Sequence, residues 1–508
     1  MLKKNIIANF FGKLWPSLLG LFLVPVYLNY LGVEAYGLIG FFVSLQGLIS
    51  FLDLGLSTTA NREVAMGKRF IDRQEKTRNV IRTLEIIYGL VSVGIALGFF
   101  FASDWLAREW INTVELKSDV VRLSVIIFGI TLALRWPVAL YGGVLQGSEK
   151  QVLYNGLYVG IATLRSLGAA LVVSFVSATV TTYLLWQFFV AILELIIMFA
   201  AAWRIMRTAS RHDPKVDFSV LGALWSFSVS VGINSLIAAL IKQLDRVLIS
   251  KLLTLPQLGY YTTAYAVYSA LPLIASSFAS AAFPRFAALI SENNDLELAN
   301  IYHKTTQFIS FLISPISAIL TFFSYDLLLI WTRSSDIARS TAPILSILAF
   351  AALFNSMMQI PFALQLAAGI TWISLWNNVV NLAVLGPFMY FLIDRYEVAG
   401  AGITWGLFNL IYYLTVPQIM HRYILPGEKC RWYFQDTFFF VILGFLPFAI
   451  IYTVGYSSLW MLLFEILLGG AFYLLIIMFL YPSIRFSVFA LLSKTSFAHL
   501  FQQKGSGS

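Results

Sequence analysis

About fourteen apolar runs, each about twenty residues long, follow one another between Asn9 and Tyr481. A helix needs about 20 apolar residues to cross the hydrocarbon core of a bilayer. The composition agrees, because 59% of the 508 residues are hydrophobic and only 12% are charged, which is outside the range of soluble domains. The sequence therefore predicts an all-α polytopic membrane protein with about fourteen transmembrane helices.

An internal repeat organises these runs. Residues 30–37 (YLGVEAYG) have a counterpart in residues 253–259 (LTLPQLG), at an offset of about 222 residues. Gly147 and Gly369 match at nearly the same offset, and each follows an intramembrane proline. Because six spans are an even number, the second unit enters the membrane in the same orientation as the first, so a pseudo-twofold axis along the membrane normal relates them. We predict two six-helix lobes around a central cavity and two extra C-terminal helices with a tail: 1–210, 211–425 and 426–508.

Basic residues concentrate in alternate connections between the apolar runs. The connection from residue 62 to residue 78 contains six lysines and arginines, and such loops face the cytoplasm in membrane proteins. Counting spans from this loop places the basic connections 204–215 and 422–431 on the same side, with both termini cytoplasmic. The net charge of +9 follows from this topology, and we expect no nucleic acid as a partner.

The run near the chain midpoint, residues 235–259, carries Lys242, Asp245 and Arg246 on one helical face. Each of these charges would cost about 3 kcal/mol if it faced lipid, so the face should look into a protein-lined cavity. The alternative is that the helix ends early and the charges extend to the membrane surface. The repeat aligns residues 231–253 with the first span, and this alignment favours the cavity.

Other spans also carry polar or ionisable residues. Lys13 lies on a polar stripe of the first span, and Asp53 shares a face of the second span with Gln46. Asp53 lies near a helix end, where it could simply be solvated, and Arg135 could extend toward the cytoplasmic surface. Near the centres of the fifth and sixth spans stand Arg165 and Glu194, for which a structural ion pair is the alternative to a role in transport.

Several chemistries have no sequence motif in this chain. There is no GxxxxGK[ST] phosphate loop, no HExxH and no CxxC, and the four histidines fall in predicted cytoplasmic segments. We therefore expect no cofactor, no metal and no catalytic residue. A membrane glycosyltransferase or polymerase would need a larger outer connection than the longest one here, about 102–119. A carrier built of repeated, proline-broken spans fits better.

Several short motifs carry a resemblance to a known family. They are residues 27–37 (YLNYLGVEAYG), Leu52-Asp53-x-Gly55-Leu56, Arg62-Glu63, and Leu244-Asp245-Arg246 followed by residues 258–261 (LGYY). Over nearly the whole chain the sequence resembles the Wzx-type polysaccharide flippases, whose superfamily includes the MATE multidrug exporters and the peptidoglycan lipid flippase. The resemblance implies a bacterial inner-membrane protein that moves undecaprenyl-diphosphate-linked oligosaccharide from the cytoplasmic to the periplasmic leaflet by alternating access. It also implies contact with membrane lipids and with other polysaccharide-assembly proteins.

The cationic cavity of that family maps onto Lys13, Arg135, Lys242 and Arg246. A diphosphate carries about two negative charges, which cannot cross hydrocarbon unaided, and arginine can bind phosphate oxygens through two parallel bonds. A MATE-type exporter of organic cations, the alternative function, would need an acidic cavity instead. Asp53 and Asp245 are candidates for coupling to a proton or sodium gradient. We expect Asp245 to hold Arg246 or Lys242 in the empty cavity and to release that cation to the cargo.

Overall fold

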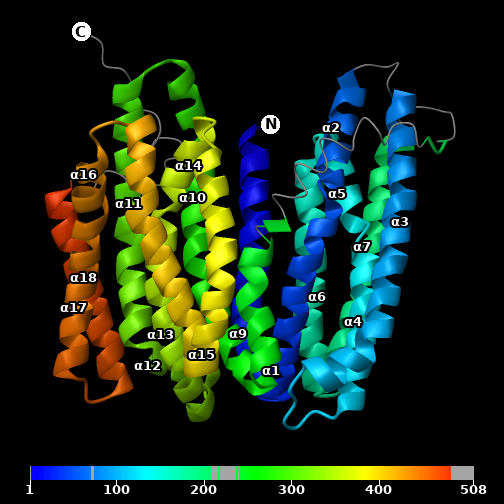
Figure 1. Cartoon of the computed structure of the whole chain (residues 1–508), viewed down its shortest axis with the longest axis horizontal. Helices are drawn as coiled ribbons and strands as arrows, with labels where there is room; N and C mark the ends of the chain where they lie inside the picture. Colours follow the sequence, from blue (N-terminus) through cyan, green and yellow to red (C-terminus); the bar gives the residue numbers. More distant parts are fainter. Residues whose placement is uncertain (1, 70–73, 208–214, 218–235, 238, 482–508) are drawn as a thin grey trace. The chain divides into compact units, whose positions relative to one another are not determined.

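Helices joined by short connections make up the protein, as the computed structural model shows for residues 2–69, 74–207, 215–217, 236–237 and 239–481 (Figure 1). For residues 2–11, 13, 68, 69 and 207 it describes the backbone alone. Within these described residues, extended pairing is limited to one isolated bridge between Asn112 and Thr254. The predicted all-α architecture is confirmed.

Eleven helices in the described part of the chain are long and apolar enough to cross a membrane. Two of them contain two predicted spans each, because α1 (Leu2–Ile49) breaks at Gly32 and α15 (Trp372–Tyr423) breaks at Glu397. The 52 residues of α15 would extend about 78 Å as one straight helix, more than twice the hydrocarbon thickness. The predicted seventh span, 231–253, is helical at 236–237 and 239–252, and its start lies outside the described residues.

Two compact units divide the chain, Met1–Thr262 and Thr263–Ser508. In the first unit α6 packs against α1 and α7, while α4 packs against α3 and α7. The boundaries predicted at 210 and 425 stay predictions. After α1 this unit contains η1 (Ser50–Asp53), α2 (Leu56–Arg69), α3 (Gln74–Trp105), η3 (Leu106–Trp110), α4 (Ser118–Arg135), α5 (Val138–Gly147), α6 (Gln151–Phe175), α7 (Val180–Arg207), helix 239–252 and the start of α9 (Leu255–Tyr268).

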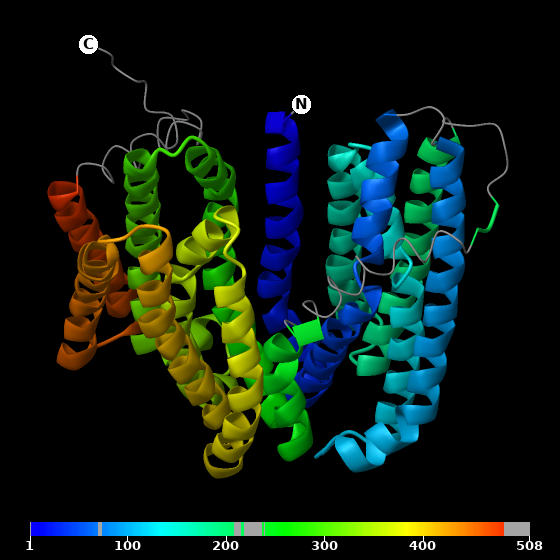
Figure 2. The same ribbon diagram turned by 45° about the horizontal axis from the view of Figure 1, so that its top comes forward.

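In the second unit α11 (Asp295–Phe322) has neighbours on several sides, and the last two helices, α17 and α18, lie beside it (Figures 1 and 2). An aromatic cluster fixes that pair, since Phe308 and Phe311 of α11 pack against Phe440 and Tyr473. The remaining elements of this unit are α10 (Ala270–Ser291), α12 (Ser324–Thr332), α13 (Ser335–Met357), α14 (Gln359–Ala367), α15, α16 (Lys429–Arg431), η4 (Trp432–Phe438), α17 (Phe439–Val454) and α18 (Leu459–Leu480).

The helix breaks recur at the offset of the sequence repeat. Gly32 interrupts α1 with a φ of 81°, a conformation that glycine adopts without steric cost, and Thr254 separates helix 239–252 from α9. Pro137 lies between α4 and α5, and Met358 lies between α13 and α14. Both pairs of breaks are separated by about 222 residues. The repeat read from the sequence is therefore also a repeat of helix interruptions.

Two glycines that match in the repeat contact each other within the first unit. A Cβ atom on Gly37 would collide with the backbone of Leu255 and Gly259, and one on Gly259 would collide with the carbonyl oxygen of Val33. The contact is reciprocal, as at an axis of two-fold symmetry. Small residues let helix backbones approach this closely, so the first turns of α9 and the segment of α1 after its break cross here backbone to backbone.

Candidate functional site: an arginine cluster in the first unit

Three ionised side chains and one amide meet where α1, α4, α6 and α7 pack together. Arg135, at the end of α4, donates from Nε to Oε2 of Glu194 and from Nη1 to Oε1 of Gln46, both at 3.3 Å. Arg165 of α6 donates from Nη2 to the same Glu194 oxygen. The predicted ion pair of Arg165 with Glu194 thus forms, and it also includes Arg135. We call Gln46, Arg135, Arg165 and Glu194 the arginine cluster.

The arginine cluster holds more positive than negative charge, because two guanidinium groups share one carboxylate. Each guanidinium has five N–H donors and cannot lose its proton in a protein. The Nε of Arg165 is buried and has no hydrogen-bond partner among the described residues. The side chains of Arg135 and Arg165 are 25% and 16% exposed, against 5% for Glu194. The cluster therefore keeps cationic donors that can bind an anion.

A second group of charged residues lies on helix 239–252. The carboxylate of Asp245 is fully buried, and it accepts hydrogen bonds from the backbone N–H of Arg246 at 2.7 Å and from the Tyr261 hydroxyl at 2.5 Å. Arg246 is 6% exposed and donates from Nη1 to Gln243 at 3.4 Å. Lys242, on the same helical face, is exposed. The hydrogen bond from Arg246 is donated by its backbone, so the expected hold of Asp245 on the guanidinium and the exchange between cations both stay predictions.

Helix α1 connects the two groups. Gly47 follows Gln46 along α1, and a Cβ atom on Gly47 would collide with the amide of Gln243, the acceptor for Arg246. Helix 239–252 therefore packs closely against α1 within one residue of the arginine cluster. Arg135 through Gln46, and Arg246 through Gln243, are thus linked to consecutive residues of α1, which point to different sides of that helix.

Of the other predicted site residues, Asp53 lies away from the arginine cluster and the side chain of Lys13 is outside the described residues. Asp53 accepts a hydrogen bond from the Ser57 hydroxyl at 2.8 Å and another from the Tyr88 hydroxyl. It no longer shares a face with Gln46, because α1 ends at Ile49 and a tight 3-10 turn follows. Asp53 is therefore neither simply solvated nor in hydrogen-bonded contact with the arginine cluster.

Some polar partners were missed by the sequence analysis. Gln243 and Tyr261 hold Arg246 and Asp245, and in the second unit His303 of α11 is buried against Asp436 of η4. Gln243 lies three residues before Arg246, a spacing at which helical side chains are neighbours, so this partner could have been found. Nothing in the sequence paired Tyr261 with Asp245 or His303 with Asp436, which are 16 and 133 residues apart. Of the described residues, no group of three or more histidine, cysteine, aspartate or glutamate side chains could hold a metal ion.

A family model described as "Polysaccharide biosynthesis protein" matches residues 2–290, more than half of the chain. The chain belongs to this family. A Shigella flexneri protein named "Putative O-antigen transporter" is 22% identical to this family member over 409 residues, which are 80% of this chain and 94% of the relative.

Solved structures of transporters share the fold of this chain. The lipid II flippase MurJ in an inward closed conformation superposes with a TM-score of 0.70 at 14% identity, covering 94% of this chain and 98% of MurJ. An inward-facing multidrug resistance MATE transporter of the MOP superfamily gives a TM-score of 0.65 at 15% identity, covering 80% and 95% of the two chains. The expected fold, that of MurJ and the MATE transporters, is confirmed, and the protein is a multi-pass membrane protein.

Proposed function

We propose that this protein is a flippase that moves undecaprenyl-diphosphate-linked oligosaccharide from the cytoplasmic to the periplasmic leaflet of the bacterial inner membrane. Both chain termini would be cytoplasmic, as the basic loops indicate. Membership of the polysaccharide biosynthesis family and the relative named as an O-antigen transporter support a lipid-linked saccharide as the cargo. Other polysaccharide-assembly proteins would then act before and after this step.

The observation that carries the proposal is the excess of arginine over carboxylate inside the first unit. Arg135 and Arg165 share Glu194. Arg246 bonds to Gln243, whose amide packs against Gly47 of α1, the residue after Gln46 of the arginine cluster. An anionic diphosphate would be bound by such donors, whereas an organic cation would be repelled by them. This charge balance favours the flippase over a MATE-type multidrug exporter, the alternative with the same fold. Lys13 and Lys242 would add positive potential without the two-pronged geometry of arginine.

Transport would proceed by alternating access, with an ion gradient as the driving force. Asp245 would hold Arg246 in the empty state and release it when the cargo phosphate arrives. Its bonds to the Arg246 backbone and to Tyr261 would keep the carboxylate in place during this exchange. A proton or a sodium ion would couple through Asp245 or through Asp53.

The test is complementation of a strain that lacks the protein. We expect deletion to abolish surface polysaccharide and to leave drug susceptibility unchanged, and the wild-type gene to restore the polysaccharide. Arg135→Ala should fail to restore it, whereas Arg108→Ala should succeed, because Arg108 is 61% exposed and pairs only at the surface with Asp104 at 2.9 Å. Normal polysaccharide together with increased drug susceptibility on deletion would instead identify an exporter.

A further inference from the structure

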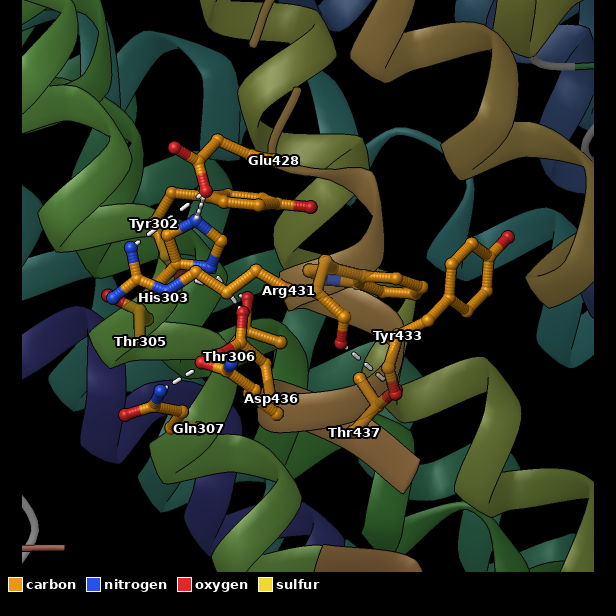
Figure 3. A network of polar contacts seen from close by, with 12 residues as sticks. Tyr302, His303, Thr305, Thr306, Gln307, Glu428, Arg431, Tyr433, Asp436 and Thr437 are labelled. Atoms are coloured by element: carbon orange, nitrogen blue, oxygen red, sulfur yellow. Dashed lines mark hydrogen bonds and ion pairs between the residues drawn. The ribbon is translucent and has the colours of Figure 1, made fainter. Parts of the chain in front are cut away.

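A buried histidine in the second unit lies between two carboxylates (Figure 3). His303 of α11 is 1% exposed, and its Nδ1 contacts Oδ2 of Asp436, a residue of η4 that is fully buried. Its Nε2 lies 3.0 Å from Oε2 of Glu428. The second oxygen of Asp436 accepts a hydrogen bond from Gln307 at 2.8 Å. We call His303, Gln307, Glu428 and Asp436 the histidine cluster.

The hydrogen bonds of this cluster need one proton more than a neutral imidazole supplies. A neutral ring carries one N–H and one lone pair, yet both ring nitrogens of His303 lie at hydrogen-bonding distance from a carboxylate oxygen. With both carboxylates ionised and the ring neutral, a lone pair would oppose one of these oxygens. The conflict disappears when the ring carries a second proton, as an imidazolium that donates to both carboxylates.

Burial adds to the demand for this proton. If the ring were neutral, the two ionised carboxylates would place two negative charges at a site where His303 and Asp436 are buried away from water. Burying charge without a compensating partner is costly. Arg431 offsets part of that charge from 3.8 Å, but its side chain is 46% exposed. Other titratable groups near the cluster include Tyr302 of α11, His421 of α15, Lys429 and Cys430 of α16, Tyr433 of η4 and Tyr481 after α18.

The cluster also has a route for protons to and from water. The side chain of Glu428 is 32% exposed, whereas His303 and Asp436 are buried behind it. A proton can therefore enter at Glu428 and reach Asp436 through the ring of His303, as histidine does in proton shuttles. Glu428 directly precedes α16, and Asp436 lies in η4, so the same bonds attach this segment to α11.

We propose that His303, Asp436 and Glu428 form a proton-binding site that holds Glu428, at the start of the α16–η4 segment, against α11 while the proton is bound. Raising the pH removes the proton, and one of the two histidine bonds is then lost. The bond to Glu428 is the one released, because this carboxylate can be solvated by water while Asp436 cannot. This site is separate from the arginine cluster and does not depend on the proposed cargo.

The test is nitrogen NMR of the full-length protein in lipid bilayers, labelled with 15N-histidine and titrated from about pH 5 to about pH 9. The sequence has four histidines, and His303→Gln identifies the signal of His303. We expect a proton on the ring nitrogens to both carboxylates at the acidic end, and one of these N–H signals lost as the pH rises. His421 is an internal control, because its Nδ1 faces one acceptor, the Pro417 carbonyl at 2.7 Å, and its Nε2 has no hydrogen-bond partner among the described residues.

Two variants complete this test. Asp436→Asn and Glu428→Gln each remove one carboxylate, so His303 should show a single N–H signal at a pH where the wild type shows two. If Asp436→Asn does not fold, Glu428→Gln alone decides, since this side chain is partly exposed. A single N–H signal on wild-type His303 across the whole titration, or two N–H signals that persist in both variants, would overturn the proposal.

The release of Glu428 can be followed separately at Cys430, two residues further along the chain, which is exposed and is the single cysteine of the sequence. An environment-sensitive fluorophore attached to this thiol should change its emission over the pH range in which the N–H signal is lost. The change should be absent in Asp436→Asn. A constant emission in the wild type, despite loss of the N–H signal, would contradict the attachment of the segment by the proton.

Discussion

The arginine cluster of the first unit has more cationic groups than carboxylates, whereas the histidine cluster of the second unit has more carboxylates than cationic groups. Arg135 and Arg165 share one carboxylate, whereas Asp436 and Glu428 share one imidazole. Arginine keeps its proton in proteins, so the first cluster has a fixed positive charge. Histidine changes its charge near neutral pH, so the charge of the second cluster depends on bound protons. Fixed cations suit an anionic cargo, and a titratable group suits a proton.

The two clusters also differ in how far their side chains are exposed. Arg135 and Arg165 are 25% and 16% exposed, whereas His303 is 1% exposed and Asp436 is fully buried. A diphosphate must reach its donors as a whole group, and this requires open space beside them. A proton needs only a continuous series of hydrogen bonds from water, which Glu428 begins.

The largest effect is expected for Glu194→Ala in the arginine cluster. This change leaves two guanidinium groups largely buried without their shared carboxylate, and breaking such a pair costs about 3–5 kcal/mol. The free energy of unfolding of the purified protein in detergent should fall by this amount. Glu292→Ala, at an exposed position after α10, should change it by less than about 0.5 kcal/mol. Equal losses of unfolding free energy in the two variants would show that the arginine cluster does not hold a fixed buried charge.

Next in size is the loss of transport in Arg246→Lys. Lysine keeps the charge but loses the planar fork that binds two oxygens, and a hydrogen bond to a charged group contributes about 1.5–3 kcal/mol. The initial rate of flipping in proteoliposomes should fall on the order of ten- to a hundredfold. Lys242→Arg is the matched control, because Lys242 is exposed on the same helix, and it should keep most of the rate. Full activity of Arg246→Lys would mean that positive charge alone suffices.

A smaller effect is expected for Asp436→Asn on stability. His303 can give up its proton when one carboxylate is removed, whereas the arginines beside Glu194 cannot, so this change should cost about 1.5 kcal/mol of unfolding free energy at neutral pH. The same denaturation assay in detergent compares it with Glu194→Ala. A loss as large as that of Glu194→Ala would show that the charge of the histidine cluster is as fixed as that of the arginine cluster.

The smallest effect is expected for Tyr88→Phe, which removes the hydroxyl that donates to Asp53. Asp53 keeps its hydrogen bond from the Ser57 hydroxyl, so the variant should lose about 1 kcal/mol of unfolding free energy or less. If Asp53 couples an ion, the pH dependence of flipping should shift in this variant while the maximal rate is kept. An unchanged pH profile would leave Asp245 as the coupling candidate.

The sequence determined the class of fold and its repeat. Run length and hydrophobicity indicate membrane helices without reference to neighbours, and glycine and proline are candidates for helix breaks. Gly32 and Pro137 lie at such breaks, whereas Pro16 and Pro25 lie inside α1, and the structure was needed to place the matching breaks at Thr254 and Met358. These signals are local, so each can be read from a short stretch of chain.

Only the tertiary structure decided which polar side chains meet. Arg135 and Glu194 are 59 residues apart in the chain, and His303 and Asp436 are 133 residues apart. Helix rotation and packing set these partners, and an apolar run with one polar residue is compatible with many rotations. The sequence could therefore nominate Arg135, Lys242, Asp245 and Arg246 as charges inside apolar runs, of which the structure buries Asp245 and Arg246 and leaves Lys242 exposed. It could not show that Glu194 would have two arginines as partners, or that a histidine would lie between two carboxylates.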